Sequence, residues 1–312
     1  MKPSQERQTG LRIVTCNVEP AAFDLVTQWA TDHGHQIVLV ITTPGPSPRT
    51  FTGHQEIVAT ARHDQDILVT TRLKRAASLI AAVQPDVILS YTFPLRIPPS
   101  VLELPRLGAV NLHPSPLPTY RGPNPARMLY DGTPTLGATL HRTSMGFDTG
   151  PILSCQGVET PENPTVAEVL ATWRRLLVAA LDDGMERLIA GDPGDQQDNE
   201  DASYAAAFTP EEHWIDWSWT AATVQRRVTA LNLLLPTAKA RAGNQVLLVE
   251  KASPLQLEGK HIPGEVLRRE GDHIVVAVAD GAVELSVGAD EAVNKPGRSG
   301  GQVLEREFVS VK

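Results

Sequence analysis

Short apolar runs alternate with helical segments along the first third of the chain. Residues 11–16, 36–42, 66–70 and 86–90 form runs of strand length, and residues 20–29 and 73–83 between them have helical spacing. This alternation predicts an α/β fold, in which a mostly parallel sheet carries helices on both faces. Ligands of such sheets bind beyond the carboxyl ends of the strands. Residues 43–53 are rich in proline and glycine and are predicted to form a loop.

The composition is that of a water-soluble chain with a substantial core. The chain has 312 residues, 41% of them hydrophobic and 21% charged, which is enough for two domains. No apolar run reaches the roughly 18 residues of a membrane span, and residues 1–10 lack the apolar part of a signal peptide. We therefore expect a cytoplasmic protein. Cys16 and Cys155 are predicted to be buried apolar residues, and no metal is expected because the chain has no cluster with metal-ligand spacing.

Residues 109–150 gather an amide, an imidazole and a carboxylate in a setting typical of a catalytic site. Asn111 follows the apolar pair at residues 109–110, His113 opens a proline-rich segment, and Asp148 lies in a Phe-Asp-Thr-Gly loop. The Asn111 carboxamide can donate an N–H to an oxyanion, and a histidine can share that contact or carry a proton. Asp148 beside His113 is expected to orient it and to raise its pKa. The alternative is structural: a turn asparagine, a capping histidine and a loop acid.

The pattern Asn-x-His-Pro-Ser-x-Leu-Pro-x-Tyr-Arg-Gly, followed by the Asp-Thr-Gly loop, resembles the signature of formyltransferases that use N10-formyltetrahydrofolate. That family includes the glycinamide ribonucleotide, methionyl-tRNA, sugar-amine and hydroxyornithine formyltransferases. The resemblance implies a Rossmann-like catalytic domain, N10-formyltetrahydrofolate as co-substrate, and catalytic roles for Asn111, His113 and Asp148. Residues 204–217 resemble the junction at which methionyl-tRNA formyltransferases pass into a C-terminal β-barrel.

The same resemblance implies where the folate is held. The pterin would lie between the segment before the Asn-x-His pattern and the loop that carries the aspartate. The matching positions are Phe93, Leu95, Arg96 and Ile97 on one side, and Ser144, Met145 and Gly146 on the other. The apolar members of this set would look the same as plain core residues. Arg121 is expected either to contact an acidic group of a substrate or to make a structural pair, and His141 to be a packed or surface histidine.

The rest of the chain predicts a long helix, a connector and a second, all-β domain. Thr165 and Glu168 fit a capping box at the start of a helix over residues 165–189, whose apolar stripe includes Leu170. Residues 191–201 read as an acidic connector. The β-rich runs 245–249, 274–278 and 283–287 indicate a small barrel or sandwich, and the resemblance implies an oligonucleotide-binding-like barrel. The predicted organisation is a catalytic domain over residues 1–191, a linker over 192–210 and a barrel over 211–312.

Charge bears on the acceptor of the formyl group. Binding of tRNA requires a basic footprint, yet residues 211–312 contain 12 Lys and Arg against 14 Asp and Glu, a net of −2, and residues 43–53 contain only one basic residue, Arg49. The expected acceptor is therefore a small amine or hydroxylamine, such as an amino acid derivative or an amino sugar. Methionyl-tRNA is the first alternative. Hydrolysis of formyltetrahydrofolate and a non-catalytic folate sensor are the others.

The turn after the first strand argues against one further class of enzyme. Residues 15–20 read Thr-Cys-Asn-Val-Glu-Pro, without the Gly-x-Gly-x-x-Gly that a dinucleotide pyrophosphate needs at this point. A nicotinamide-dependent enzyme is therefore disfavoured. The family commonly places a glycine in this turn, and this chain departs from that pattern. The sequence does not predict the oligomeric state.

Overall fold

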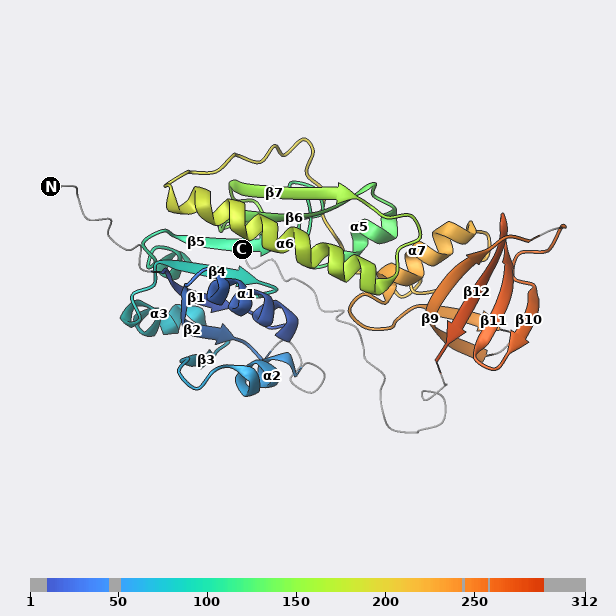
Figure 1. Cartoon of the computed structure of the whole chain (residues 1–312), viewed down its shortest axis with the longest axis horizontal. Helices are drawn as coiled ribbons and strands as arrows, with labels where there is room; N and C mark the ends of the chain where they lie inside the picture. Colours follow the sequence, from blue (N-terminus) through green and yellow to red (C-terminus); the bar gives the residue numbers. More distant parts are fainter. Residues whose placement is uncertain (1–9, 45–51, 243–244, 258, 289–312) are drawn as a thin grey trace, which may run out of the picture.

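The structure is a computed structural model that describes residues 10–44, 52–242, 245–257 and 259–288 (Figure 1). A seven-stranded sheet with helices on its faces is followed by a five-stranded sheet at one end of the molecule. The elements of the first part are β1 (Arg12–Cys16), α1 (Pro20–Asp32), β2 (Gln36–Thr42), α2 (Gly53–Thr60), β3 (Ile67–Val69), α3 (Leu73–Ala82), β4 (Val87–Tyr91), α4 (Pro99–Leu102), β5 (Ala109–His113), α5 (Ala126–Asp131), β6 (Thr135–Arg142), β7 (Ile152–Glu159) and α6 (Val166–Ile189).

The predicted mostly parallel sheet is confirmed. Its order is β3-β2-β1-β4-β5-β6-β7, in which β1 to β5 run parallel and β6 is antiparallel to both of its neighbours. The four predicted strand runs correspond to β1 to β4. The sequence places Asn111 directly after the apolar pair at residues 109–110. In the structure that pair opens β5, and the strand continues through His113, so Asn111 lies inside it. Helix α2 begins where the predicted loop over residues 43–53 ends, and residues 45–51 of that loop, with Arg49, lie outside the described residues.

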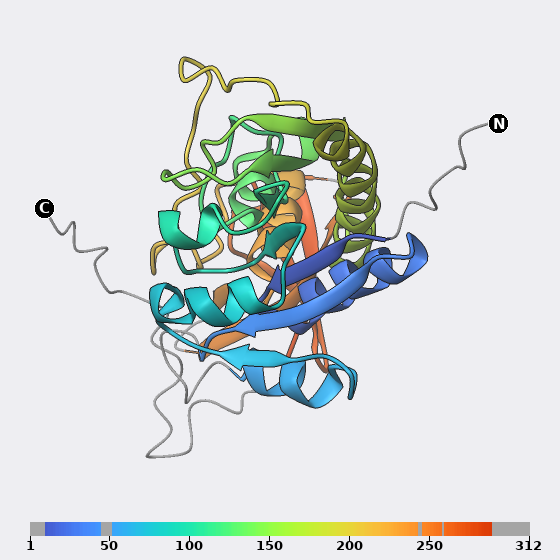
Figure 2. The ribbon, with the colours of Figure 1, turned by 90° about the vertical axis from the view of Figure 1, so that its left-hand side faces the viewer.

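Alternate side chains of the strands enter two separate cores, as the pleat of a β-strand requires. Ile13 packs in the core beneath α1 and α6, and its neighbour Val14 packs in the core beneath α3 and α4. Figure 2 shows the sheet between these helical layers. On the first face, the Trp29 indole donates a hydrogen bond of 2.7 Å to Asp182 of α6, which joins the two helices. The two buried faces hold the carboxyl ends of β1, β4 and β5 in fixed register.

Helix α6 confirms the capping box that the sequence predicts. The Thr165 hydroxyl accepts the Glu168 backbone N–H at 3.2 Å, and the Glu168 carboxylate accepts the Thr165 backbone N–H at 2.8 Å. The predicted apolar stripe is wrong at Leu170, which is 44% exposed, because Val169 next to it is the residue that faces the sheet. Cys16 is buried as predicted, whereas Cys155 on β7 is exposed. Its strand lies at the outer edge of the sheet, with β6 as its neighbour.

The C-terminal part is the predicted small all-β unit. Its sheet is antiparallel with the order β10-β11-β12-β9-β8. It is preceded by α7 (Ala221–Leu231), and its strands are β8 (Lys239–Ala242), β9 (Gln245–Leu255), β10 (Val266–Glu270), β11 (His273–Val278) and β12 (Gly281–Val287). Glu212, ahead of α7, accepts a hydrogen bond of 2.9 Å from Arg127 of α5 and so links the two parts. None of the described helices has the length and apolar character needed to cross a membrane.

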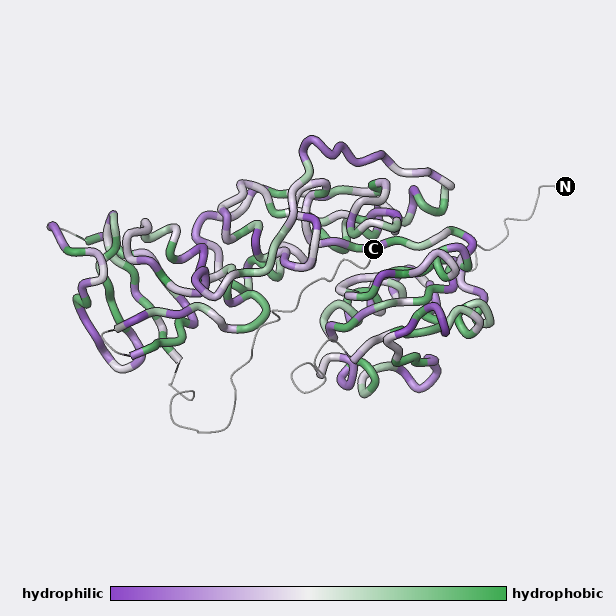
Figure 3. The backbone as a smooth tube through the Cα atoms, turned by 180° about the vertical axis from the view of Figure 1, so that it is seen from behind, coloured by the Kyte–Doolittle hydropathy of each residue, from purple (hydrophilic) through white to green (hydrophobic). Residues whose placement is uncertain are grey.

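The acidic connector after α6 lies against the first sheet. Figure 3 shows this segment as a hydrophilic trace. Asp195 exchanges two backbone hydrogen bonds of 2.8 Å with Ile152 of β7, and Arg187 of α6 pairs with Asp192 at 2.7 Å. The first half of the predicted linker therefore packs on the seven-stranded sheet, close to the loop between β6 and β7.

Candidate active site

Strand register places three polar side chains next to one another. Ser90 pairs with Asn111 across β4 and β5, and Asn111 pairs with His141 across β5 and β6. Because residues in register point to the same face of a sheet, their side chains meet. The Ser90 hydroxyl donates to the Asn111 amide oxygen at 2.8 Å, which fixes the orientation of the amide. The amide nitrogen of Asn111 therefore points toward His141 and Asp148.

Both N–H groups of Asn111 have protein partners. Its Nδ2 lies 3.1 Å from His141 Nε2 and 3.2 Å from Asp148 Oδ1. His141 Nδ1 lies 2.9 Å from the Arg142 carbonyl, which can only accept, so this nitrogen donates and Nε2 accepts from Asn111. A substrate oxygen would have to share or take over one of these two N–H groups. Asn111 is thus a donor whose direction is already set.

His113 is buried and held by a backbone carbonyl. Its Nε2 donates to the Tyr120 carbonyl at 3.0 Å, and its Nδ1 lies 3.7 Å from Asp148 Oδ2. Burial lowers the pKa of His113, and this effect exceeds the upward shift from Asp148 and from the Tyr120 hydrogen bond. Asp148 raises the pKa of His113 as expected, but the net shift is downward because the desolvation of a charged imidazole outweighs the attraction of the nearby carboxylate. His113 is therefore neutral at pH 7, with the lone pair of Nδ1 toward Asp148.

Asp148 is held as a carboxylate by the groups around it. Burial alone raises its pKa, but the adjacent His141 and His113 and the backbone N–H of Gly122 outweigh burial and lower that pKa to about 2. The Gly122 N–H donates to Asp148 Oδ2 at 2.8 Å. Asp148 has a φ of 54°, in the left-handed region that a residue with a side chain seldom adopts. The charge and the orientation of Asp148 both depend on its surroundings.

The proline-rich segment after His113 is anchored to β6. The Thr139 hydroxyl donates to the Ser115 carbonyl at 2.8 Å and accepts the Leu117 N–H at 3.1 Å. Gly137 leaves room for this segment, since a Cβ at that position would lie 2.7 Å from Pro116. The segment packs on the sheet and returns Tyr120 and Gly122 to the site.

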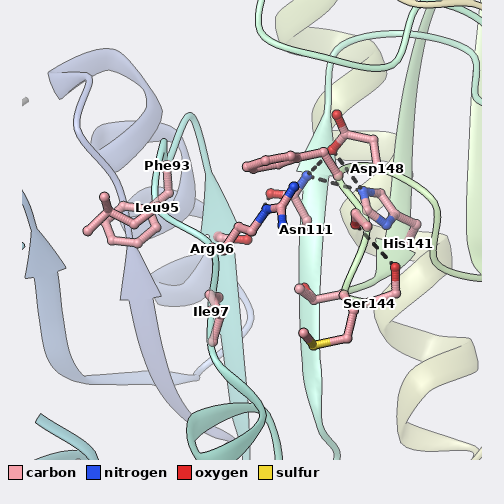
Figure 4. Close-up of a pocket in the computed structure, with 13 residues that line it drawn as sticks. Phe93, Leu95, Arg96, Ile97, Asn111, His141, Ser144 and Asp148 are labelled. Atoms are coloured by element: carbon pink, nitrogen blue, oxygen red, sulfur yellow. Dashed lines mark hydrogen bonds and ion pairs between the residues drawn. The ribbon is translucent and has the colours of Figure 1, made fainter. Parts of the chain in front are cut away.

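All seven positions expected to hold the folate line one pocket together with Asn111 and Asp148. The first wall carries Phe93, Leu95, Arg96 and Ile97, and the second carries Ser144, Met145 and Gly146, with Ser90, His141, Thr143 and Phe147 as further lining residues. Figure 4 shows the two walls facing each other with Asn111 between them. The Arg96 guanidinium lies 4.7 Å from the centre of the Phe147 ring and so spans the slot between the walls. His113 is not among the lining residues of this pocket.

A basic groove adjoins the first wall. It is lined by Arg72, Lys74 and Arg75 at the start of α3 and shares Leu95 and Arg96 with the slot. Within the part of the chain that the structure describes, no carboxylate lies within ion-pair distance of these four cations. Exposed cations close to the amino end of a helix attract anions.

Four further residues lie near the site. The sequence predicts two alternative roles for Arg121 and no site role for His141, Ser90 or Gln197. Arg121 is 2% exposed and makes a structural pair, but its partners are the amide oxygens of Gln197 and Asn199 and not an acid. His141 was expected to be a packed or surface histidine; it is 2% exposed and directly contacts Asn111. Its signal in the sequence is a polar residue two positions after Thr139 in an apolar run, which places both on one face of the strand. Ser90 ends a predicted strand, and Gln197 lies in the acidic connector.

Two family profiles and several curated relatives match the chain. A profile described as formyl transferase matches residues 13–181, and one described as the formyl transferase C-terminal domain matches residues 207–294. The methionyl-tRNA formyltransferase of Pseudomonas fluorescens is 32% identical over 262 residues, which cover 82% of this chain and 81% of that protein. The methionyl-tRNA formyltransferase of Legionella pneumophila, strain Philadelphia 1, is 30% identical over 67% of each chain.

Solved structures share the fold at lower identity. HypX from Aquifex aeolicus has a TM-score of 0.66 and 21% identity over 88% of this chain, which spans 44% of HypX. An N-formyltransferase from Helicobacter canadensis, in complex with folinic acid and dTDP-3-aminofucose, has a TM-score of 0.61 and 15% identity over 89% of this chain and 99% of its own. The profile match spans more than half of the chain and includes Asn111, His113, His141, Asp148 and all residues of the slot. The chain belongs to the formyl transferase family.

Proposed function

We propose that this enzyme transfers the formyl group of N10-formyltetrahydrofolate to the amine or hydroxylamine of a small metabolite. The observation that supports this most directly is that Asn111 and Asp148 line the same slot as the 93–97 and 144–146 walls. The slot offers aliphatic and aromatic side chains to a flat ring system and the polar groups of Asn111 and Asp148 to a reacting carbonyl. The family uses N10-formyltetrahydrofolate, and HypX has been crystallised with tetrahydrofolic acid.

In this mechanism the neutral amine of the acceptor attacks the formyl carbon. Asn111 donates an N–H to the oxygen as it becomes negative, in exchange for one of its present partners. The Nδ1 lone pair of neutral His113 takes the proton that the amine loses, directly or through a water. The imidazolium formed in this way lies beside Asp148, whose carboxylate stabilises it. Collapse of the tetrahedral intermediate leaves the formylated amine and tetrahydrofolate, with the proton returned to the N10 nitrogen.

The basic groove suits the remaining part of the donor. The glutamate carboxylates of a folate are ionised at neutral pH, and the groove continues from the slot through Leu95 and Arg96. Arg72, Lys74 and Arg75 are exposed, so each contributes modestly in water and the effect of salt should be visible. We infer that the slot holds the pterin and that the groove receives the glutamate.

Tetrahydrofolate should raise the Tm, because a ligand at 100 times its Kd stabilises the native state by about 2.7 kcal/mol. NAD and ATP should not raise it. The double variant Arg72→Gln with Arg75→Gln should bind tetrahydrofolate more weakly and bind a pterin without glutamate as the wild type does. Isothermal calorimetry measures both. Absence of folate binding at millimolar concentration would contradict the donor assignment.

The charge of the chain favours a small acceptor. The chain carries a net charge of −8, and residues 211–312 carry a net of −2 from 12 basic and 14 acidic residues. A phosphate backbone would meet this surface without a strong field to attract it. A small amine needs no such field.

Methionyl-tRNA is the second candidate, and two observations favour it. The relatives from Pseudomonas fluorescens and Legionella pneumophila are methionyl-tRNA formyltransferases. In addition, Arg227 lies 4.1 Å from the centre of the Trp219 ring, and Arg241 lies 4.5 Å from that of Trp214, a basic and aromatic cluster of the kind that nucleic acids contact.

The acceptor prediction separates the two candidates by salt. With a small amine, KM should change little between 50 and 200 mM salt. With tRNA, the logarithm of the association constant should fall linearly with the logarithm of the salt concentration, with a slope of about −0.9 for each neutralised phosphate. Turnover of a panel of amino acids, hydroxylamines and amino sugars, followed by mass spectrometry, should identify a formylated product. Formylation of charged initiator tRNA with no turnover across that panel would overturn the small-amine proposal. It would leave the site chemistry intact.

A further inference from the structure

Gln197 bridges the loop of Asp148 and a buried cation. Its side-chain nitrogen donates to the Asp148 carbonyl at 2.9 Å and to the Gly150 carbonyl at 2.7 Å. Its side-chain oxygen accepts from Arg121 Nε at 3.0 Å and from Arg121 Nη2 at 2.7 Å. The side-chain amide of Gln197 thus donates two hydrogen bonds and accepts two, all with protein groups. The chain separates Gln197 from Asp148 by the whole of β7 and α6.

The partner of Gln197 is a guanidinium with little access to water. Arg121 is 2% exposed, and Asn199 supplies a further oxygen at 3.1 Å from its Nη1. A buried cation is ordinarily paired with a carboxylate, which would neutralise it. Here both partners are amides. A carboxylate at position 197 would suit Arg121 better, but it would have no N–H groups for the two carbonyls of the Asp148 loop.

The backbone on both sides of Arg121 completes the arrangement. The next residue, Gly122, donates its N–H to the Asp148 carboxylate at 2.8 Å. The Arg121 backbone pairs with the end of the connector, through Arg121 N–H to Ser203 O at 2.9 Å and Ala205 N–H to Arg121 O at 2.7 Å. Asp148 is thus held by its side chain through Gly122 and by its main chain through Gln197. Both of these groups are fixed by Arg121.

We propose that Gln197, acting with Arg121, is a positioning residue that holds Asp148 in its left-handed conformation and so aims its carboxylate at His113 and Asn111. A backbone outlier of this kind persists only where neighbouring groups hold it. This inference rests on the proposed catalytic role of Asp148. It adds that the connector after α6 is part of the active site, since without Gln197 the Asp148 and Gly150 carbonyls lose the donor that holds the turn.

The test is the isosteric variant Gln197→Glu with Asn199→Asp as its matched control. Gln197→Glu keeps the contact with Arg121 but replaces the two N–H donors by an oxygen that repels both carbonyls. Its kcat should fall at least about tenfold, as for displacement of a catalytic group, with the KM of the formyl donor nearly unchanged. Asn199→Asp keeps its contact with Arg121 and does not touch the Asp148 loop, so its kcat should stay at the wild-type level.

Two further measurements separate positioning from folding. The Tm of Gln197→Glu should stay close to that of the wild type, because Arg121 gains a carboxylate partner. Hydrogen–deuterium exchange of the peptide that contains residues 143–151 should be faster in Gln197→Glu than in Asn199→Asp. If Gln197→Glu does not fold, Gln197→Met, which is similar in length and lacks a donor, carries the same expectation for kcat and exchange.

The outcomes distinguish this inference from the function on which it rests. A kcat of Gln197→Glu equal to that of the wild type, with Asp148→Ala inactive, would overturn the positioning role alone. Equal losses of kcat in Gln197→Glu and Asn199→Asp would also overturn it, because they would indicate a general effect on Arg121. An active Asp148→Ala would instead refute the proposed catalytic role of Asp148, on which this inference rests.

Discussion

Replacing Asn111, His113 or Asp148 by Ala should lower kcat at least ~10²-fold, the usual effect of removing one donor or proton carrier from a site of this type. In the proposed mechanism each residue has a separate task. Asn111 would stabilise the oxyanion, His113 would take the amine proton, and Asp148 would stabilise the imidazolium that results. The loss of kcat is measured by steady-state kinetics with a saturating formyl donor and an acceptor that the wild-type enzyme formylates.

The pH profile should distinguish the roles of His113 and the acceptor. Burial lowers the pKa of His113, so its neutral form should persist at pH values below its usual range. The acid limb of the rate should therefore follow the amine of the acceptor, with activity rising as that amine loses its proton. An acid limb that stays at one pH for acceptors of different amine pKa would contradict this assignment.

A matched control separates chemistry from stability. Asp86 is a partly buried carboxylate paired with Arg106 at 3.0 Å. It directly precedes the first residue of β4, whereas Ser90 lies near the carboxyl end of that strand. Asp86→Ala should therefore cost some stability while leaving kcat unchanged. Near-normal rates in all three site variants would refute the catalytic assignment.

Gly150→Ala should be nearly as damaging as loss of Asp148. A Cβ at Gly150 would lie 1.7 Å from the Arg142 carbonyl oxygen, a backbone atom that cannot turn aside. The loop between β6 and β7 must then shift, and Asp148 lies two residues earlier in that loop. We expect a loss of kcat of about 10² from this displacement and a loss of unfolding free energy of about 1–3 kcal/mol from overpacking. Thermal denaturation and kinetics measure the two effects.

Gly157→Ala is the matched control on the neighbouring strand. A Cβ at Gly157 would meet Thr135 Cγ2 at 3.2 Å and the Leu136 carbonyl oxygen at 3.7 Å, so a small movement of one methyl group accommodates it. Its kcat should equal that of the wild type. Comparable losses in Gly150→Ala and Gly157→Ala would show that the sheet edge tolerates no added methyl group and that the loop geometry is not the cause.

Much of this protein could be read from local sequence. The alternation of apolar runs and helical segments specified the parallel part of the sheet, because burial on both faces leaves a pattern within each strand. The capping box at Thr165 specified the start of α6 for an equally local reason. A single long motif brought Asn111 and His113 together, since they lie two residues apart on β5, and its resemblance supplied Asp148 and the seven slot positions.

Only the tertiary structure decided the features that depend on distant groups. His141 belongs to the site because β6 pairs with β5 in a register that places it opposite Asn111, and no pattern within β6 states that register. The pKa of His113 moves down because the whole sheet and its helices exclude water from the imidazole, an effect that the adjacent aspartate does not reveal. Gln197 reaches Asp148 only after β7 and α6 have folded back along the sheet. Sequence patterns record what neighbours along the chain need, whereas desolvation and contacts across long loops arise from the packed fold as a whole.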